Sequence, residues 1–182
     1  MNQAILTMRS EGATVIEIDK ISEDEVGRNS FTIMLYEYKQ GLNDYFASLG
    51  SDAPIKSLEE LIEWNKNDNL ELEHFGQEYL EMAQKKDGLD SQDYKEHLDS
   101  LIKLSRKEGM DRIMNEYDLD AIIAPTNSPA WKTDLENGDT FVLGSSSPAA
   151  RSGYPNITVP MGMIDRLPVG ISIFGRAWSE PT

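Results

Sequence analysis

Apolar residues between positions 30 and 49 recur at spacings of three and four, which predicts an amphipathic helix. The positions are Phe31, Met34, Leu35, Tyr38, Leu42, Tyr45, Phe46 and Leu49. A second, shorter helical pattern begins at Leu58. Ser57 and Glu60 fit a capping box in front of it, with Ser57 as the cap and Glu60 reaching back toward it. This part of the chain is therefore expected to be helical.

Two further helices are predicted before position 118. Apolar residues around positions 75–80 indicate a short helix, and those between positions 91 and 117 indicate a longer one. Gly109 is expected to weaken or bend the longer helix, because glycine has a low helix propensity. Residues 1–11 resemble the end of a helix.

The segment after position 11 predicts a change of structure. Gly12 suits the residue that follows a helix, where a left-handed conformation is required. Residues 13–18 are rich in β-branched side chains and predict a short strand. A helix that leads into a strand is typical of α/β proteins.

From Leu119 onward the pattern favours strands. Residues 120–126 form a short apolar run ended by proline, which predicts a buried strand. A loop rich in Ser, Asn, Gly and Pro follows over positions 126–148. Two more strands are predicted at 156–160 and 168–174, and the seven residues between them are few enough for a hairpin. We therefore expect an α/β fold with part of a mixed β-sheet flanked by helices, and an acidic helical excursion.

Charge distinguishes the two parts of the chain. The 182 residues carry a formal net charge of −15. Residues 1–120 hold 13 basic and 27 acidic side chains, whereas residues 121–182 hold 4 and 5. No basic patch with interleaved aromatic residues is evident, which argues against nucleic-acid binding. An acidic surface is repelled by anionic lipid, and no apolar run reaches the roughly 18 residues of a membrane helix, so no membrane partner is expected.

The chain contains no cysteine. Disulfides, thiol nucleophiles and cysteine-based zinc sites are therefore excluded, and the composition is compatible with a reducing compartment. The N-terminus has no basic segment followed by a long apolar stretch, so a signal peptide is not predicted. We expect a cytoplasmic protein.

Candidate chemistry centres on hydroxyl groups near the predicted strand ends. A serine cluster, Ser145, Ser146 and Ser147, follows Gly144. A serine nucleophile needs a neighbouring base. The only histidines, His74 and His97, lie in the acidic helical part, and Lys132 has Asp134 two residues away, which opposes the lowered pKa of a catalytic lysine.

The cluster is therefore interpreted as a polar turn or substrate-side loop rather than a nucleophile. In open α/β sheets, ligands bind where strands end. This places Thr126 and Ser145–Ser147 as candidates for a substrate pocket. The acidic residues and histidines lack metal-site spacing, and no phosphate-binding glycine pattern is present, so neither a metal nor a cofactor is expected.

Three segments carry a resemblance to a known family. They are Leu-Asp-Ala-Ile-Ile-Ala-Pro-Thr at 119–126, Gly-Tyr-Pro-Asn-Ile-Thr-Val-Pro-Met-Gly at 153–162 and Leu-Pro-Val-Gly-Ile-Ser-Ile-Phe-Gly at 167–175. Their order and spacing resemble the C-terminal part of amidase-signature hydrolases over about residues 119–180. Residues 13–18 resemble the strand that follows the catalytic region of that family.

The resemblance implies a serine hydrolase that acts on carboxamides. Such enzymes use a lysine, a serine in a strained cis peptide and a nucleophilic serine. The segment 144–150 lacks the paired glycines of the family signature, so no catalytic residue is assigned in this chain. The chain is expected to begin after the catalytic segment and to end before the last helix. It divides into a helix end plus strand (1–20), an acidic helical region (21–118) and an amidase-like sheet region (119–182).

Three functional hypotheses remain open at this point. In the first, the chain is the C-terminal part of an amidase, inactive alone, and supplies sheet strands and one wall of the pocket. Its partners are then an amide substrate and the N-terminal catalytic half of the same protein, and the isolated chain is expected to dimerise. In the second, it is a short acidic α/β binding or interaction module without enzyme activity. In the third, it is a small independent serine hydrolase built on Ser145–Ser147.

Overall fold

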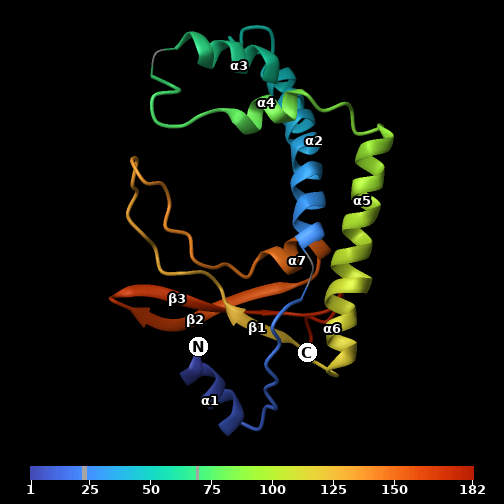
Figure 1. Ribbon diagram of the computed structural model, residues 1–182, viewed down its shortest axis with the longest axis vertical. Coiled ribbons are helices and arrows are strands. Elements are labelled where there is room, and N and C mark those ends of the chain that lie inside the picture. Colours follow the sequence, from blue (N-terminus) through green and yellow to red (C-terminus); the bar gives the residue numbers. More distant parts are fainter. Residues whose placement is uncertain (22–23, 69) are drawn as a thin grey trace. The chain divides into compact units, whose positions relative to one another are not determined.

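The computed structural model describes residues 1–21, 24–68 and 70–182 (Figure 1). Two compact units are present: a sheet unit of residues 1–26 and 101–182, and a helical unit of residues 27–100. The elements are α1 (Asn2–Ser10), α2 (Asp24–Ser48), α3 (Leu58–Asn67), α4 (Glu78–Gln84), α5 (Gln92–Ser105), the π-helical turn η1 (Arg106–Met110), α6 (Asp111–Glu116), β1 (Ile122–Pro125), α7 (Ser147–Ser152), β2 (Asn156–Ile164) and β3 (Leu167–Phe174). None of the helices in the described ranges is both long and apolar enough to cross a membrane.

The first helix ends as expected, but the strand predicted after it is absent. Gly12 has a φ of +99°, and its backbone N–H donates to Arg9 O while that of Ala13 donates to Met8 O, which is the Schellman arrangement. The prediction of a strand at 13–18 was wrong, because these residues do not join the sheet. β-branched composition favours an extended chain, but a strand also needs a partner with which to pair.

The helical unit is assembled around α2 and α3. Its buried apolar core consists of Leu35, Leu58, Ile62 and Ala83. At the start of α3, the Ser57 hydroxyl accepts a hydrogen bond from Glu60 N at 3.1 Å, as expected for the cap. The Glu60 carboxylate accepts from Lys56 N at 2.7 Å instead of from Ser57 N, so only half of the predicted capping box forms.

Hydrogen bonds between side chains join α2 to α5 in the helical unit. The Tyr36 hydroxyl donates to Asp93 Oδ2 at 2.6 Å. His97 Nδ1 lies 2.6 Å from Asn29 Oδ1. His97 therefore has a structural role in this unit, which the sequence did not reveal.

The long helix predicted between positions 91 and 117 is interrupted. α5 passes into η1 and then into α6, and Gly109 lies within η1. The expected weakening at Gly109 is confirmed by this π-helical turn. The predicted acidic helical region, 21–118, includes residues 22, 23 and 69, which lie outside the described residues.

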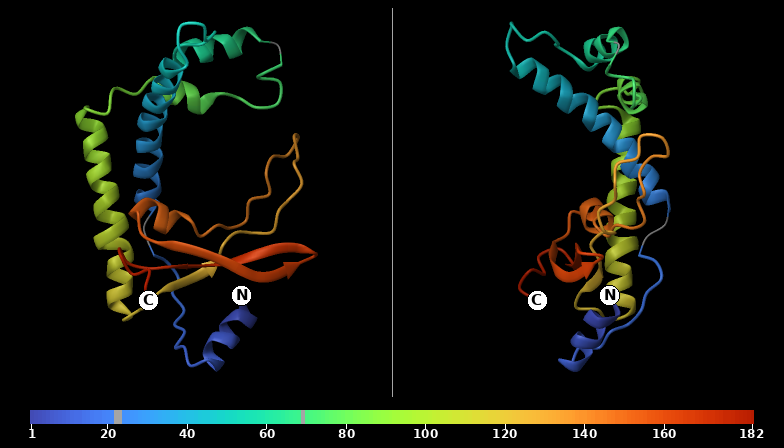
Figure 2. Two further views of the ribbon diagram at one scale, coloured as in Figure 1. Left: turned by 180° about the vertical axis from the view of Figure 1, so that it is seen from behind. Right: turned by 90° about the vertical axis from the view of Figure 1, so that its left-hand side faces the viewer.

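The described strands form one antiparallel sheet in the order β1–β3–β2. β2 and β3 make the predicted hairpin, a twisted pair in both views of Figure 2. Asp165 and Arg166, with φ values of 48° and 70°, form the two-residue connection, as favoured in tight hairpins.

β2 is longer than predicted. It continues past Pro160 to Ile164, with an irregular register between Pro160 and Gly162. Proline is tolerated there because β2 lies at an edge of the described sheet. The α/β fold class with a sheet flanked by helices is confirmed.

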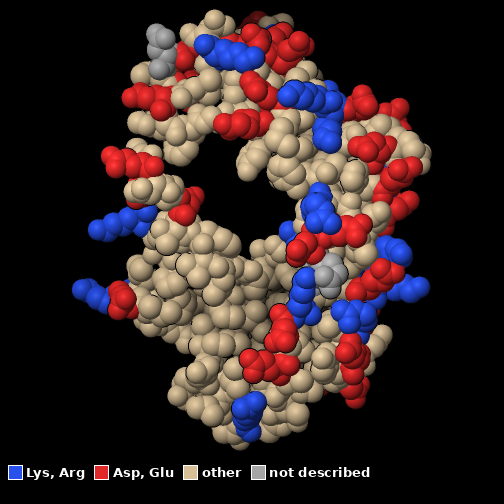
Figure 3. Space-filling view, in the orientation of Figure 1, with Lys and Arg blue, Asp and Glu red and all other residues tan. Residues whose placement is uncertain are grey.

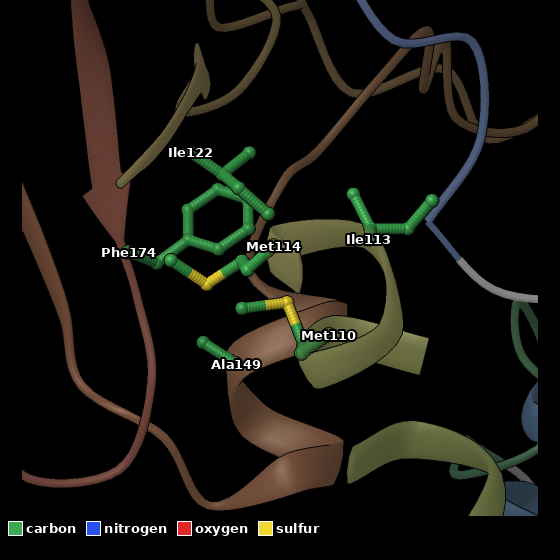
Figure 4. Close-up of a cluster of buried hydrophobic side chains, with 6 residues drawn as sticks. All are labelled: Met110, Ile113, Met114, Ile122, Ala149 and Phe174. Carbon is green, nitrogen blue, oxygen red and sulfur yellow. The ribbon is translucent and has the colours of Figure 1, made fainter. Parts of the chain in front are cut away.

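The core of the sheet unit packs on one face of this sheet (Figure 4). Met110 and Met114 from η1 and α6 meet Ile122 of β1 and Phe174 of β3, and Ala149 of α7 lies beside them. The register pairs Ile122 with Phe174, so both side chains project from the same face. This packing fixes α7, and the loop that precedes it, next to the sheet.

Alternation along the strands divides the sheet into two faces of different character. The core face continues from Ile122 and Phe174 to Ala124 and Ser172 in the pairing register. The opposite face carries apolar side chains, among them Ile157 and Val159 on β2. These two are 60% and 38% exposed, respectively, in the described structure.

Candidate functional site

Three hydroxyl groups meet where the core face of the sheet becomes polar. Ser172 Oγ donates to Thr126 Oγ1 at 3.0 Å, Thr126 Oγ1 donates to Thr158 Oγ1 at 3.3 Å, and Thr158 Oγ1 lies 3.2 Å from Ser172 Oγ. The three contacts close a ring, which we call the hydroxyl ring. Thr158 pairs with Ser172 across the β2–β3 ladder, and Thr126 directly follows β1. The ring therefore joins all three strands.

Gly170 is the residue that leaves space for this ring. Its carbonyl accepts the Thr126 N–H at 2.9 Å, which continues the β1–β3 ladder. A Cβ atom added at Gly170 would lie 2.8 Å from Thr158 Cγ2 and 2.9 Å from Thr126 Oγ1. Any larger residue would therefore displace the hydroxyl groups.

The serine loop lies against the ring through Ser145 alone. The Ser145 N–H donates to Thr126 O at 3.1 Å, and its hydroxyl approaches the same oxygen at 3.4 Å. Ser145 is 8% exposed. Ser146 is the N-cap of α7 without a side-chain capping bond, and Ser147 is the first residue of that helix. The structure thus brings Thr126 and Ser145 together, and leaves Ser146 and Ser147 at the start of α7.

The serine loop has no base beside it. His74 and His97 belong to the helical unit, whereas the serines belong to the sheet unit. Within the described ranges, no side-chain hydrogen bond joins Ser145, Ser146 or Ser147 to a basic group. Lys132 is exposed on the loop that extends away from the sheet in Figures 1 and 2. In the part of the chain that is described, no group of three or more His, Asp or Glu side chains has the arrangement of a metal site.

Tyr154 and Arg106 hold α7 in place beside the sheet. The Tyr154 hydroxyl donates to the Asp111 carboxylate, and burial, followed by this hydrogen bond, raises the pKa of Tyr154. Arg106 Nε donates to Ser152 O at 2.7 Å, and its guanidinium lies 5.9 Å from the centre of the Tyr154 ring. These contacts fix the C-terminal end of α7 and so support the loop that carries Ser145.

The surface around this region carries little charge. On the face shown in Figure 3, charged side chains gather over the helices, while the area over β1–β3 is largely uncharged. This agrees with the small number of charged residues after position 120. A neutral region of this kind suits a neutral polar ligand better than an ion.

Sequence reasoning found Thr126 but missed three residues of the site: Thr158, Ser172 and Gly170. The available signal was the period-two alternation of strands 156–160 and 168–174, which assigns Thr158 and Ser172 each to one face of its strand. The alternation does not say which residues lie opposite each other. Only the register of the ladder pairs Thr158 with Ser172.

Comparisons with known proteins agree with this architecture. The family described as Amidase matches residues 1–182. The peptide amidase PAM, solved in complex with the competitive inhibitor chymostatin, superposes with a TM-score of 0.88 at 40% identity, covering 99% of this chain and 37% of that protein. The native peptide amidase from Stenotrophomonas maltophilia superposes with a TM-score of 0.84 at 38% identity, with 99% and 36% covered.

Curated relatives match over smaller shares of their length. A putative amidase of Schizosaccharomyces pombe is 24% identical over 191 residues, covering 90% of this chain and 30% of that protein. A glutamyl-tRNA(Gln) amidotransferase component of Exiguobacterium sibiricum is 35% identical over 81 residues, covering 42% and 16%. The chain thus spans less than a third of these two relatives and slightly more than a third of the solved peptide amidases. With the family match along its whole length, this chain belongs to the amidase family.

Proposed function

We propose that this chain is the C-terminal part of an amidase that hydrolyses carboxamide C–N bonds, with peptide amides as its substrate class. The observation that carries this proposal is the 40% identity to a peptide amidase over 99% of the chain. The reaction adds water to a primary amide and releases ammonia: R–CO–NH2 + H2O gives R–COOH + NH3.

The role of this chain is to provide one wall of the substrate pocket. The hydroxyl ring and Ser145 lie at the polar end of the core face, where Thr126 follows β1. Hydroxyl groups on a sheet held by a packed core are fixed in position, as a binding wall requires. The serine loop lacks a basic partner among the described residues, so the nucleophile and its base are assigned to the N-terminal catalytic half of the same protein.

The apolar face of the sheet supports the same assignment. Ile157 and Val159 lie on the face opposite the hydroxyl ring and are exposed. Apolar positions on a sheet face are normally covered by another layer. We assign this face to contact with the N-terminal half of the protein.

The experiment compares this chain alone with the intact amidase that contains it. Both are incubated with an N-terminally blocked dipeptide amide, and ammonia release is measured. The intact enzyme is expected to turn over, and the isolated chain is not, because a serine needs a base and an oxyanion site. Turnover by the isolated chain that disappears in Ser146→Ala would instead establish an independent serine hydrolase. No ammonia release by the intact enzyme from any peptide amide would refute the proposed activity.

A further inference from the structure

The hydroxyl ring has no hydrogen-bond donor left for a ligand. Each threonine or serine hydroxyl carries one proton and two acceptor positions. In the ring each of the three groups donates once and accepts once. The circulation can run in either direction, and in both cases all three protons point along the ring. What remains is one acceptor position on each oxygen.

Two of the three groups are accessible to a ligand. Ser172 is 1% exposed, whereas Thr126 is half-buried and Thr158 is exposed. Ser172 therefore anchors the ring from below, and the unused acceptor positions of Thr126 and Thr158 face outward. The ring presents a fixed pair of acceptors with no competing donor.

The neighbouring loop does not change this polarity. Ser145 directs both its N–H and its hydroxyl toward Thr126 O, so its donors are also engaged. Around Thr126, the described structure thus offers acceptors to an incoming group. A substrate carbonyl oxygen, which only accepts, gains nothing from such a surface, whereas an N–H group does.

We propose, building on the proposed amidase function, that Thr126 and Thr158 accept a hydrogen bond from the N–H of the scissile carboxamide and so distinguish amides from esters. An ester has an oxygen in place of this N–H and leaves the acceptors unpaired. A site built to hydrogen-bond a substrate N–H rejects the analogue that lacks it, because its polar groups are then buried without a partner. Thr126 and Thr158 are specificity residues, and Ser172 is a positioning residue that acts through them.

The test measures kcat/KM of the intact amidase for a matched pair: a blocked dipeptide amide and the methyl ester of the same dipeptide. Thr158→Val keeps the shape and removes the hydroxyl. It is expected to lower kcat/KM for the amide by about twofold to tenfold, the loss of one neutral hydrogen bond. The value for the ester should stay nearly unchanged. Thr158→Ser should restore the amide value, and Thr133→Val, on the exposed loop, is the matched control.

An equal loss for amide and ester in Thr158→Val would show that the ring only supports the fold, and would overturn the proposal. No loss for either substrate would overturn it as well. Ser172→Ala serves as the second variant, because it opens the ring from the buried side and should reduce the same amide preference.

A binding measurement separates this inference from the proposed activity. Calorimetry compares the affinity of the intact protein for the dipeptide amide and for its N,N-dimethylamide, which has no N–H on the terminal nitrogen. A preference for the primary amide that is lost in Thr158→Val supports the ring as the N–H acceptor even if no ammonia is released. Equal affinities in the wild-type protein would overturn the inference even if the enzyme is an active amidase.

Discussion

The Tyr154 hydroxyl lies 3.1 Å and 3.0 Å from the two carboxylate oxygens of Asp111, and so joins the segment after α7 to the start of α6. The two residues are 43 positions apart in the sequence. The contact braces the layer that covers the core face of the sheet.

We expect Tyr154→Phe to lower the free energy of unfolding by about 1.5 kcal/mol, as for a hydrogen bond to a charged group. Burial and the bond to Asp111 raise the pKa of Tyr154 in the folded state. The stabilisation is therefore fully present below the unfolded pKa of about 10 and is lost as the pH rises through the higher folded value. Urea unfolding at pH 7 and at several pH values above 10 measures this. A difference between wild type and variant that grows with alkaline pH would contradict the assignment.

The methionine core provides a second prediction. Met114 is 0% exposed and contacts the buried cluster of the sheet unit. Met114→Ala should lower the free energy of unfolding by about 2–5 kcal/mol, because it removes buried apolar surface and leaves a cavity. Met163→Ala, at a position that is 71% exposed, is the matched control and should change stability by less than about 0.5 kcal/mol. Equal effects of the two substitutions in chemical unfolding would show that this cluster is not the core.

Gly170→Ala tests the space around the hydroxyl ring. The added methyl group would contact Thr158 and Thr126 at less than 3.0 Å, so the ring must open. We expect a loss of about 1–3 kcal/mol in unfolding free energy, as for overpacking, together with a lower kcat/KM for amides in the intact enzyme. Gly41→Ala, on α2 with no atom within 4 Å of the new Cβ, should instead stabilise the helix by about 0.5–1 kcal/mol. Unchanged stability and turnover in Gly170→Ala would mean that the ring adapts without cost.

The exposed edge of the sheet predicts self-association of the isolated chain. β2 is an edge strand of the described sheet, and Ile157 on it is 60% exposed. Unpaired edges and apolar faces pair with other chains. Gel filtration with light scattering should show dimers or larger species, and Ile157→Lys should reduce them. Thr133→Lys is the control for added charge. A monomeric wild-type chain that binds no hydrophobic dye would argue for a complete, independent domain.

The serine loop provides a prediction for the intact enzyme. If it forms part of the pocket wall, alanine at Ser145, Ser146 or Ser147 should each lower kcat/KM by about twofold to tenfold, which corresponds to one neutral hydrogen bond. Ser145 should have the largest effect, because it alone contacts Thr126. A loss of about a million-fold at one position is the behaviour of a nucleophile and would place the catalytic serine in this chain.

Local patterns in the sequence were sufficient for the elements whose stability is local. Helical spacing located α2, the Ser57 cap located the start of α3, and Gly12 ended α1 in the left-handed conformation. Apolar runs located β1 and β3 to within two residues. Each of these features depends on residues that are close in the chain.

Tertiary structure decided the features that depend on pairing between distant segments. Residues 13–18 have the composition of a strand but do not join the sheet, and β2 extends past a proline because it lies at an edge. The hydroxyl ring joins Thr126 to Ser172, 46 residues away, and becomes visible only once the ladder fixes the register. A shift of one residue would turn Thr158 to the opposite face, so strand composition alone could not place it there. The sequence by itself thus determined the family and most of the elements. The site required the register, which is set by the packing of Phe174 and Ile122 against Met110 and Met114.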